Sequence, residues 1–487
     1  MTKATAPSPE GFPRMSAPPA SARDVARLSR QVRAYARLAA GQSARRLRSW
    51  NPPLEHINTA LRNGGEKLLQ RAREMEASNA YAARAVEIWS GYAVRDGIRP
   101  TIRNARARAA WEDWVDDCDF DEIDGLAGLQ DLVAREVYVG GEAFVQKVMV
   151  GDRLTIKVLP SEMLPLRDLG LPSTAGGEVR SGIEFDASGR RAAYHFYSRH
   201  PGDLSSGKVT APPTIRVPAS EVIHVYERRN AGQIRGLSRL AAGMIRLWLL
   251  DGYDDAELDR QRIAALFAAF VTRPADEEPS SLLGEDADNP GAPATADTGA
   301  DDQAAVLDLA PALVQFLEPG EEITFTNPPQ LQGQYEAFQY RNLLAVAAAF
   351  GVPYHSLTGD VEKANYSASR AAQLDFKVGI TRFQNRCLIG QLGAGLRRWF
   401  LADAALLGRV SAAAARERWV WNSPRWDWVD PKADSEAAAL EVERGFTSRR
   451  RVVESRGYSL EEIDREIEED RFRVGPGNEE RIHDEEA

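Results

Sequence analysis

Hydrophobic and polar residues repeat with two different periods along this chain, and the change of period divides it. Residues 54–94 carry apolar residues at three- and four-residue steps, which predicts helices broken at Asn63-Gly64-Gly65 and again near Ser78-Asn79. From residue 137 onward, short runs rich in β-branched and aromatic residues alternate with turn residues, which predicts an antiparallel sheet. Asp186-Ala187-Ser188-Gly189 separates two such runs and predicts a hairpin connection. The pattern therefore indicates a mixed α+β protein.

The helical period returns over residues 236–271. Its first apolar residues recur at helical steps and are Leu237, Leu240, Met244 and Leu247. Asp251, Asp255 and Asp259 follow at successive i+4 positions, so they share one face of the predicted helix. Like charges at this spacing destabilise an isolated helix by about 0.2–0.5 kcal/mol per pair. Such a row is either an ordinary hydrated face of the helix or a surface whose negative charge has a function.

A further helix is predicted over residues 335–350, and Gly351-Val352-Pro353 ends it. A polar loop and a short polar box follow. The loop residues of interest are Asp360, Glu362 and Lys363, and those of the box are Asn365, Tyr366, Ser367 and Arg370. Ser367 is a candidate cap for the next helix, and residues 376–407 again have the helical pattern.

Four tryptophans follow within ten residues, and they are Trp419, Trp421, Trp426 and Trp428. Tryptophans at alternate positions indicate anchors packed on a half-buried surface, although stacking on nucleic-acid bases is another use of such side chains. The neighbouring positive charges are offset by acidic residues, which favours packing.

Composition adds limits on size and compartment. A chain of 487 residues is too long for one ordinary core and is expected to form two or more packing units. It has neither a run of 18 apolar residues nor the layout of a secretory signal, so we expect no membrane span and no export before assembly. Cys118 and Cys387 are the only cysteines, and we expect buried thiols rather than a disulfide.

Charge is distributed unevenly. Residues 1–110 contain 20 Lys and Arg against 8 Asp and Glu, so this first quarter is basic and the rest of the chain is acidic. Its arginine clusters are either the solvated face of a helix or a phosphate-binding surface. Residues 276–302 contain nine acidic residues and no Lys or Arg, and residues 459–487 contain 12 acidic and 4 basic residues. Both segments have the composition of solvated or protein-binding stretches.

The motifs of common enzymes are missing from the sequence. It has no G-x-x-x-x-G-K-[ST] phosphate loop, no G-x-S-x-G elbow and no H-E-x-x-H pair, so we expect any ATP hydrolysis to belong to a partner. The six histidines are scattered without a cluster of cysteines or carboxylates around them. We therefore expect no enzyme activity, no cofactor and no metal site.

One stretch resembles a known family. The order YEAFQYRNLLAVAAAFGVPYHSLTGDVEKANYSASRAAQLDF, residues 335–376, is similar to the portal proteins of lambda-like tailed bacteriophages. In these proteins a Gly-Val-Pro turn ends a helix, and an Asn-Tyr-Ser-x-x-Arg box follows an acidic loop. Further segments follow in the family's order, among them DGIRP, WEDWVDDCDFD, VIHVYERRNAGQIRGLS, LEPGEEITFTNPP and WDWVDPKAD. The resemblance extends over about residues 50–458.

The resemblance implies an α+β portal fold assembled as a ring, usually of twelve subunits, at one capsid vertex. Double-stranded DNA would pass through its channel during packaging and ejection. The implied partners are the terminase large subunit, the scaffold and major capsid proteins, and the head-completion proteins. The chain would stay in the host cytoplasm until it joins the virion. The alternative from the residues alone is a cytoplasmic nucleic-acid-binding protein that uses the basic first quarter.

The resemblance also implies an order of subdomains. A basic and partly disordered segment (1–49) precedes a wing (50–235), a stem helix (236–271), an acidic loop with the clip (272–316), a second wing part (317–376), a helical crown (377–458) and an acidic tail (459–487). Channel-lining candidates are Asp251, Asp255, Asp259, Asp360, Glu362 and Lys363, because carboxylates repel the phosphates of moving DNA. Subunit-contact candidates are Asn365, Tyr366, Ser367 and Arg370.

Overall fold

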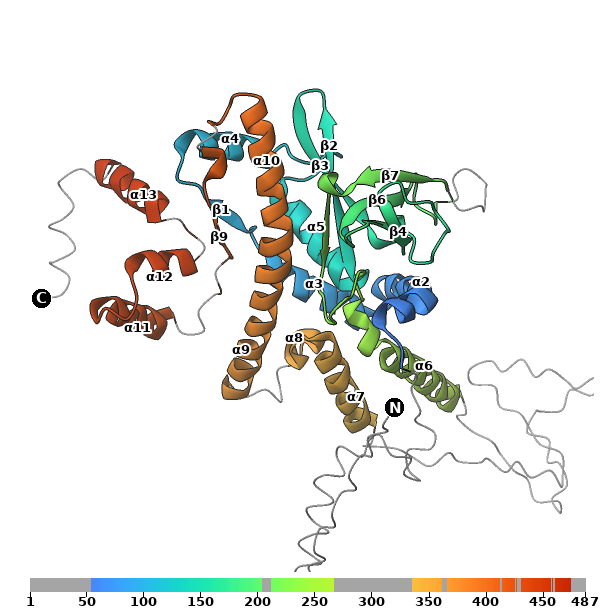
Figure 1. The fold of residues 1–487 in the computed structure, drawn as a ribbon. Helices are drawn as coiled ribbons and strands as arrows, with labels where there is room; N and C mark the ends of the chain where they lie inside the picture. Colours follow the sequence, from blue (N-terminus) through green and yellow to red (C-terminus); the bar gives the residue numbers. More distant parts are fainter. Residues whose placement is uncertain are drawn as a thin grey trace, which may run out of the picture. The chain divides into compact units, whose positions relative to one another are not determined.

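The computed structural model describes residues 54–203, 212–266, 335–360, 366–411, 414–424, 426, 431–456, 458 and 460–473. The chain divides into two compact units, Met1–His56 and Ile57–Ala487, and every described helix and strand lies in the second. That unit is a mixture of helices and antiparallel sheets (Figure 1). The predicted α+β class is therefore confirmed.

Two helices open the unit, α2 (Ile57–Ser78) and α3 (Ala80–Val94). Between them the side chain of Asn79 accepts hydrogen bonds from the N–H groups of Tyr81 and Ala82, both at 3.1 Å, and caps α3. The predicted break near Ser78-Asn79 is confirmed. The predicted break at residues 63–65 is wrong, because α2 continues through it. Gly65 is buried against Leu166, and this packing offsets the weak helix propensity of the two glycines.

One short strand and two helices follow, namely β1 (Arg99–Thr101), α4 (Ala105–Val115) and α5 (Leu126–Val139). Strand β1 pairs antiparallel with β9 (Val420–Asn422), which joins segments more than 300 residues apart in the sequence. The large core includes Trp89 of α3, Tyr138 of α5 and Phe383, and the ring centroids of Trp89 and Tyr138 are 5.6 Å apart.

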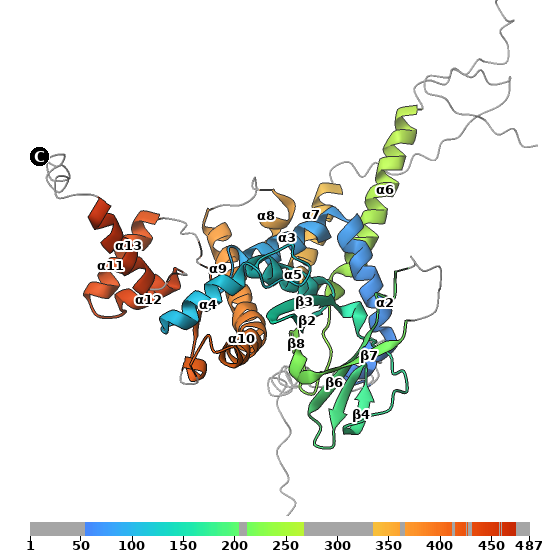
Figure 2. The same ribbon diagram turned by 90° about the horizontal axis from the view of Figure 1, so that it is seen from above.

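The strands form two larger antiparallel sheets, as predicted (Figure 2). One has the order β3 (Arg153–Pro160), β2 (Glu142–Val150) and β8 (Val222–Tyr226). The other has the order β4 (Gly176–Arg180), β5 (Ile183–Asp186), β6 (Arg191–Tyr197) and β7 (Thr214–Pro218). A smaller core that includes Phe144, Tyr194 and Phe196 lies between them. The predicted hairpin at residues 186–189 is confirmed, because it joins β5 to β6 and its turn is closed by the Asp186 carboxylate.

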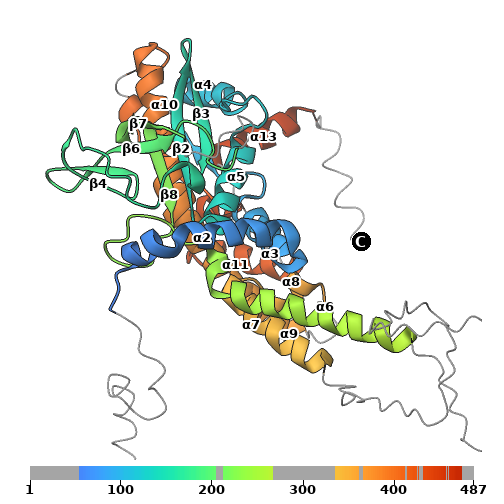
Figure 3. The ribbon, with the colours of Figure 1, turned by 90° about the vertical axis from the view of Figure 1, so that its right-hand side faces the viewer.

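Helix α6 (Met244–Leu266) follows a 3-10 turn at Arg239–Ala242. The helix predicted over 236–271 therefore begins later than expected, because residues 236–238 pass against Gly141 and Gly243 packs closely on Phe350. Residues 267–271 lie outside the described part. Helix α7 (Tyr335–Phe350) runs antiparallel to α6, since Gly243 lies beside Phe350 while Asp254 bonds to Tyr335 (Figure 3).

The predicted end of α7 is confirmed. Gly351 has φ +72°, and the N–H groups of Gly351 and Val352 both donate to the carbonyl of Ala347, at 2.9 and 3.1 Å. Helix α8 (Tyr354–Thr358) follows, and then one long helical run comprises α9 (Tyr366–Phe383), a π-helical segment (Gln384–Gly393) and α10 (Ala394–Leu406). Because α9 already begins at Tyr366, Ser367 lies inside its first turn, so the predicted capping role is wrong.

The C-terminal helices are α11 (Pro431–Glu443), α12 (Arg449–Ser455) and α13 (Leu460–Arg473). Ion pairs of 2.7 Å between Arg449 and Asp464 and of 2.8 Å between Arg450 and Glu461 join α12 to α13. The segment predicted as an acidic tail thus begins with a helix. None of the described helices is long and apolar enough to cross a membrane.

Candidate functional site

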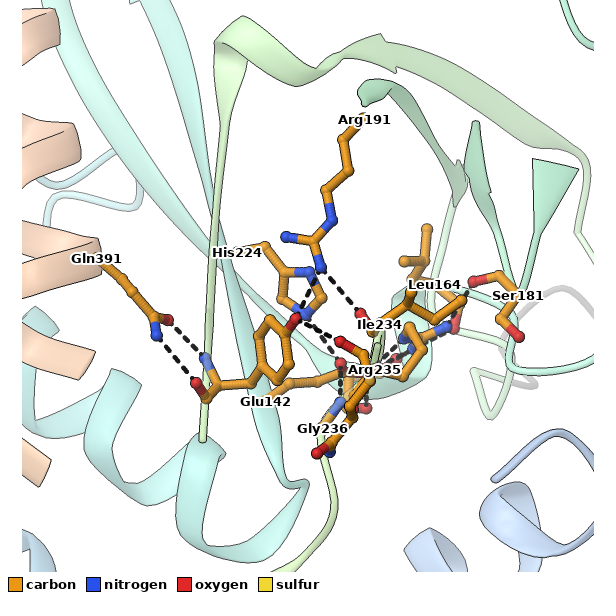
Figure 4. A network of polar contacts seen from close by, with 12 residues as sticks. Glu142, Leu164, Ser181, Arg191, His224, Ile234, Arg235, Gly236 and Gln391 are labelled. Carbon is orange, nitrogen blue, oxygen red and sulfur yellow. Dashed lines mark hydrogen bonds and ion pairs between the residues drawn. The ribbon is translucent and has the colours of Figure 1, made fainter. Parts of the chain in front are cut away.

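The chain that leads into α6 is fixed to the sheets by a buried ion pair between Glu142 and Arg235 (Figure 4). Glu142 is the first residue of β2, and the side chains of both partners are only 1% exposed. The Arg235 guanidinium donates to Glu142 Oε1 at 2.8 Å and to three backbone carbonyls at 2.8–2.9 Å, which belong to Leu164, Pro165 and Ser181. One arginine therefore joins β2 to the loops that precede β4 and β5.

The second oxygen of Glu142 binds two more groups. Glu142 Oε2 accepts the N–H of Gly236 at 2.6 Å and lies 2.9 Å from Nε2 of His224 on β8. Burial alone would raise the pKa of Glu142, but Arg235 and His224 outweigh it and hold this pKa well below its usual range. Burial lowers the pKa of His224 to about 4, against the opposing effect of Glu142. The carboxylate is thus charged and the imidazole neutral at pH 7.

A second set of contacts joins this network to the long helical run. Tyr226, at the end of β8, receives a hydrogen bond from Arg191 at its hydroxyl, at 2.8 Å. The side-chain amide of Gln391 bonds to both the N–H and the carbonyl of Tyr226, at 2.9 and 3.0 Å (Figure 4). Gln391 lies in the π-helical segment, so this segment is fixed to the edge of the sheet.

Arg239 anchors the 3-10 turn before α6 to the helical core. Its guanidinium lies 3.7 Å from the ring centroid of Trp89 and donates to Glu227 at 2.7 Å. The Tyr138 hydroxyl donates to the carbonyl of Phe350 at 2.9 Å, which fixes the end of α7 to the same core. Both helices of the α6–α7 pair are therefore held at their inner ends.

The outer part of the pair is held by polar and aromatic contacts. Asp254 accepts hydrogen bonds from the hydroxyl of Tyr335 and the amide of Gln339, both at 2.9 Å. The rings of Tyr253 and Phe338 are 5.1 Å apart. Burial and the Asp254 carboxylate raise the pKa of Tyr335 to about 12. Asp254, not one of the predicted channel residues, is thus an acidic residue through which α6 binds α7.

The three predicted aspartates of α6 are all exposed, but they differ in their contacts. Asp251 accepts a hydrogen bond from Asn79 at 3.2 Å, and Asp259 forms an ion pair of 3.2 Å with Arg262. Asp255 is exposed between them. The structure therefore places them on one accessible side of α6, and of the three only Asp255 has no hydrogen bond or ion pair within the described part of the chain.

The predicted loop and box are only partly described. Asp360 is half-buried, its carboxylate lies 3.4 Å from the Tyr354 hydroxyl, and its N–H donates to Thr358 at 3.2 Å. Glu362, Lys363 and Asn365 lie outside the described residues, as does the side chain of Tyr366. Ser367 and Arg370 are exposed on the first turns of α9.

The tryptophans and cysteines lie where packing predicts. Trp419 is buried, with its ring centroid 4.9 Å from that of Trp111, and Trp421 is 6.1 Å from the same ring. Packing rather than base stacking is therefore confirmed for these two. Cys118 and Cys387 are buried free thiols, as expected, and burial raises the pKa of each to about 12.

Sequence reasoning missed Glu142, Arg235 and His224. A weak signal existed, since Glu142 follows two glycines and Arg235 precedes Gly236. Nothing in the sequence brings these two segments together, however, because they are 93 residues apart. In the sequence, a strand histidine that belongs to a buried polar network looks the same as any other strand histidine.

The polar side chains of this site bond mainly to one another and to backbone groups, so the arrangement fixes the α6–α7 pair to the sheets and to the helical core. The sequence profile of the phage portal protein, lambda family, matches residues 43–384. The chain therefore belongs to the lambda family of phage portal proteins, which are structural, non-enzymatic components of the virion.

Two curated relatives have similar lengths. The portal protein of Escherichia phage N15 is 24% identical over 464 residues, which is 86% of each chain. Portal protein B of Escherichia phage lambda is 24% identical over 460 residues, covering 86% of this chain and 85% of that one. Among solved structures, a chain from the neck of a native gene transfer agent particle, computed with C12 symmetry, matches 78% of this chain and 91% of its own length. Its sequence identity is 16% and its TM-score 0.43.

Proposed function

We propose that copies of this chain form a closed ring, of twelve subunits, at one vertex of a capsid, and that double-stranded DNA passes through its centre in packaging and ejection. The observation that carries this is the family match over residues 43–384, which includes the two larger sheets, α6, α7 and all of α9. The structure is compatible with a ring, because the α6–α7 pair is anchored at its inner end and α6 leaves an exposed surface available to a neighbouring copy.

The subdomain order expected from the family is part of this proposal. Residues 50–235, which hold both larger sheets, form the wing. Residues 236–271 with α6 form the stem, and residues 317–376 with α7 form the second wing part. The helices within 377–458 form the crown, and 459–487 the acidic end. Residues 1–49 and 272–316, expected to be the basic segment and the clip, lie outside the described part.

The channel wall is assigned to one side of α6. Asp255 and Asp259 would face the DNA, with Asp251 closer to the wing because it bonds to Asn79. Carboxylates in this position repel phosphates, and a passing duplex needs weak contacts rather than the counterion release that lysines would bring. Asp360, Glu362 and Lys363 would form the narrowest part, and Asn365, Tyr366, Ser367 and Arg370 the adjacent subunit contact.

The proposed partners are those of a portal. They are the terminase large subunit, which would supply ATP hydrolysis, the scaffold and major capsid proteins, and the head-completion proteins. A nucleic-acid-binding protein that uses the basic first quarter is the alternative, but base stacking by Trp419 and Trp421 does not support it, because both rings pack against Trp111.

Size-exclusion chromatography with light scattering, followed by negative-stain imaging, tests the ring directly. We expect a particle of about a dozen copies with a central hole and no retention of duplex DNA at moderate salt. A monomer or dimer at every protein concentration, with salt-sensitive DNA affinity, would contradict the ring and support the alternative.

A further inference from the structure

One side of α6 carries an exposed row of apolar and small residues. Ile245 and Leu249 are 70% and 59% exposed, and Gly252 and Ala256 continue the row at the same helical spacing. A Cβ placed on Gly252 would meet no atom within 4 Å, so a neighbouring helix has room to approach there. We call these four residues the α6 row.

The α6 row adjoins the proposed channel side. At 3.6 residues per turn, Leu249 lies about 120° from Asp255 around the helix, whereas Gly252 lies only about 20° from Asp259. The helix also buries Met244, Leu247 and Leu250 on its remaining side. Helix α6 therefore has one side packed in its own chain and an exposed surface on which the acidic residues and Trp248, 65% exposed, border the apolar α6 row.

Helix α9 carries a row with the same spacing. Ser367, Ala371, Leu374 and Val378 are all exposed, the last two by 56% and 70%. Phe376 and Ile380 are buried on the other side of α9 in the large core. We call these four exposed residues the α9 row.

The two rows cannot meet within one chain. Helix α6 packs on α7, α7 packs on α8, and both α8 and α9 pack on α3. Figures 1 and 2 show α7 and α8 between α6 and α9. Two different patches, on helices at the two ends of this helical layer, suit a head-to-tail interface, and such an interface closes into a ring when the rotation permits.

The charges of the two helices are complementary. Helix α6 has five acidic and three basic residues, whereas α9 has three basic and one acidic residue. Arg370 directly precedes Ala371 and lies beside the α9 row. Asp255 and Asp259 lie beside the outer part of the α6 row. Contact between like helices would bring acidic residues together, so the charges favour α6 against α9.

We propose that the α6 row of one copy packs against the α9 row of the next copy in the ring. This rests on the proposed function, because it assigns the surfaces by which that ring closes. It also gives the polar box a place, since Ser367 of that box belongs to the α9 row.

A cysteine pair tests the contact. The double variant Leu249→Cys/Val378→Cys, treated with a short bis-maleimide, is expected to give a ladder of covalent multimers on denaturing gels. Each single variant should stay monomeric on the same gel, and so should the control pair Leu249→Cys/Ile215→Cys, whose second site is 55% exposed on β7. The native Cys118 and Cys387 are buried and should give no background.

Gly252→Leu provides a second readout that does not depend on cross-linking. The site has open space in the single chain, so the helical circular dichroism and melting temperature should be kept while the ring peak is lost in light scattering. Gly64→Leu is the matched control, because Gly64 is an exposed glycine in α2 with equally open space, and its ring should persist.

The outcomes separate the two proposals. A ring that forms in Gly252→Leu, or a double cysteine variant that forms rings but no ladder, overturns the α6–α9 contact and leaves the ring intact. Cross-linking by Leu249→Cys alone shows α6 facing α6 and also overturns it. A wild-type chain that never exceeds a monomer overturns the ring and this contact with it.

Discussion

At the scale of single residues, the most unusual feature is a buried set of charges that carries no chemistry. Glu142 and Arg235 are each bonded at nearly every polar atom, which is the condition under which a buried ion pair is tolerated. A buried pair of this kind adds little to stability compared with apolar residues, but it specifies which segments meet. Here it specifies the entry of the chain into α6.

His224 gives this network a pH dependence. Its pKa is lowered from 6.5 to about 4 in the folded protein, so the unfolded chain binds the proton more tightly. Stability from this group is complete above pH 6.5 and is lost as the pH falls towards about 4, by up to about 3 kcal/mol. Thermal melting between these two pH values should show this fall in the wild-type chain.

The variant His224→Gln removes the titrating group and should flatten the fall in melting temperature over this window. His200→Gln is the control, because His200 is exposed, and it should melt like the wild type at every pH. An equally steep fall in His224→Gln would show that other groups cause the acid sensitivity.

At the scale of elements, the crossing of two chain segments determines where α6 begins. Gly141 has φ +88°, and a Cβ there would lie 2.5 Å from the carbonyl carbon of Leu237. Neither the backbone angle nor the space allows another residue, so the segment before α6 can pass the start of β2 only at this glycine.

Gly141→Ala should therefore destabilise the protein well beyond the cost of its backbone angle. Gly151→Ala is the matched control, because Gly151 also has a positive φ, +61°, but open space around it. The control should cost about 1–2 kcal/mol, and Gly141→Ala at least about 2 kcal/mol more because of overlap with Leu237. Urea unfolding measures both, and equal costs would refute the role of the crossing.

Elements whose ends depend on neighbouring residues were predictable from the sequence. The C-terminal end of α7 and the β5–β6 hairpin follow from local turn chemistry at Gly351-Val352-Pro353 and at residues 186–189. The start of α6 and the unbroken α2 were not, because each depends on a glycine packed against a distant segment. The Glu142 network was missed for the same reason, since contacts across 93 residues leave no local pattern.

At the scale of the whole molecule, the acidic residues of α6 lie on different sides of the helix and have different contacts. Asp254 is used for packing on α7, while Asp255 and Asp259 stay exposed on the side proposed to face DNA. Within the acidic row found in the sequence, Asp251 bonds to Asn79, so the proposed channel role falls on Asp255 and Asp259.

The double variant Asp255→Lys/Asp259→Lys should still form rings but should hold duplex DNA that wild-type rings release. Lysines on the channel wall would displace counterions from the phosphates, so retention should be strong near 50 mM salt and lost by about 200 mM. Filter retention of labelled duplex by purified rings measures this. Asp113→Lys/Asp152→Lys makes the same change of charge at two exposed sites on α4 and in the β2–β3 turn. If that control retains DNA equally well, net charge rather than the α6 wall governs the contact, and the assignment of Asp255 and Asp259 to the channel fails.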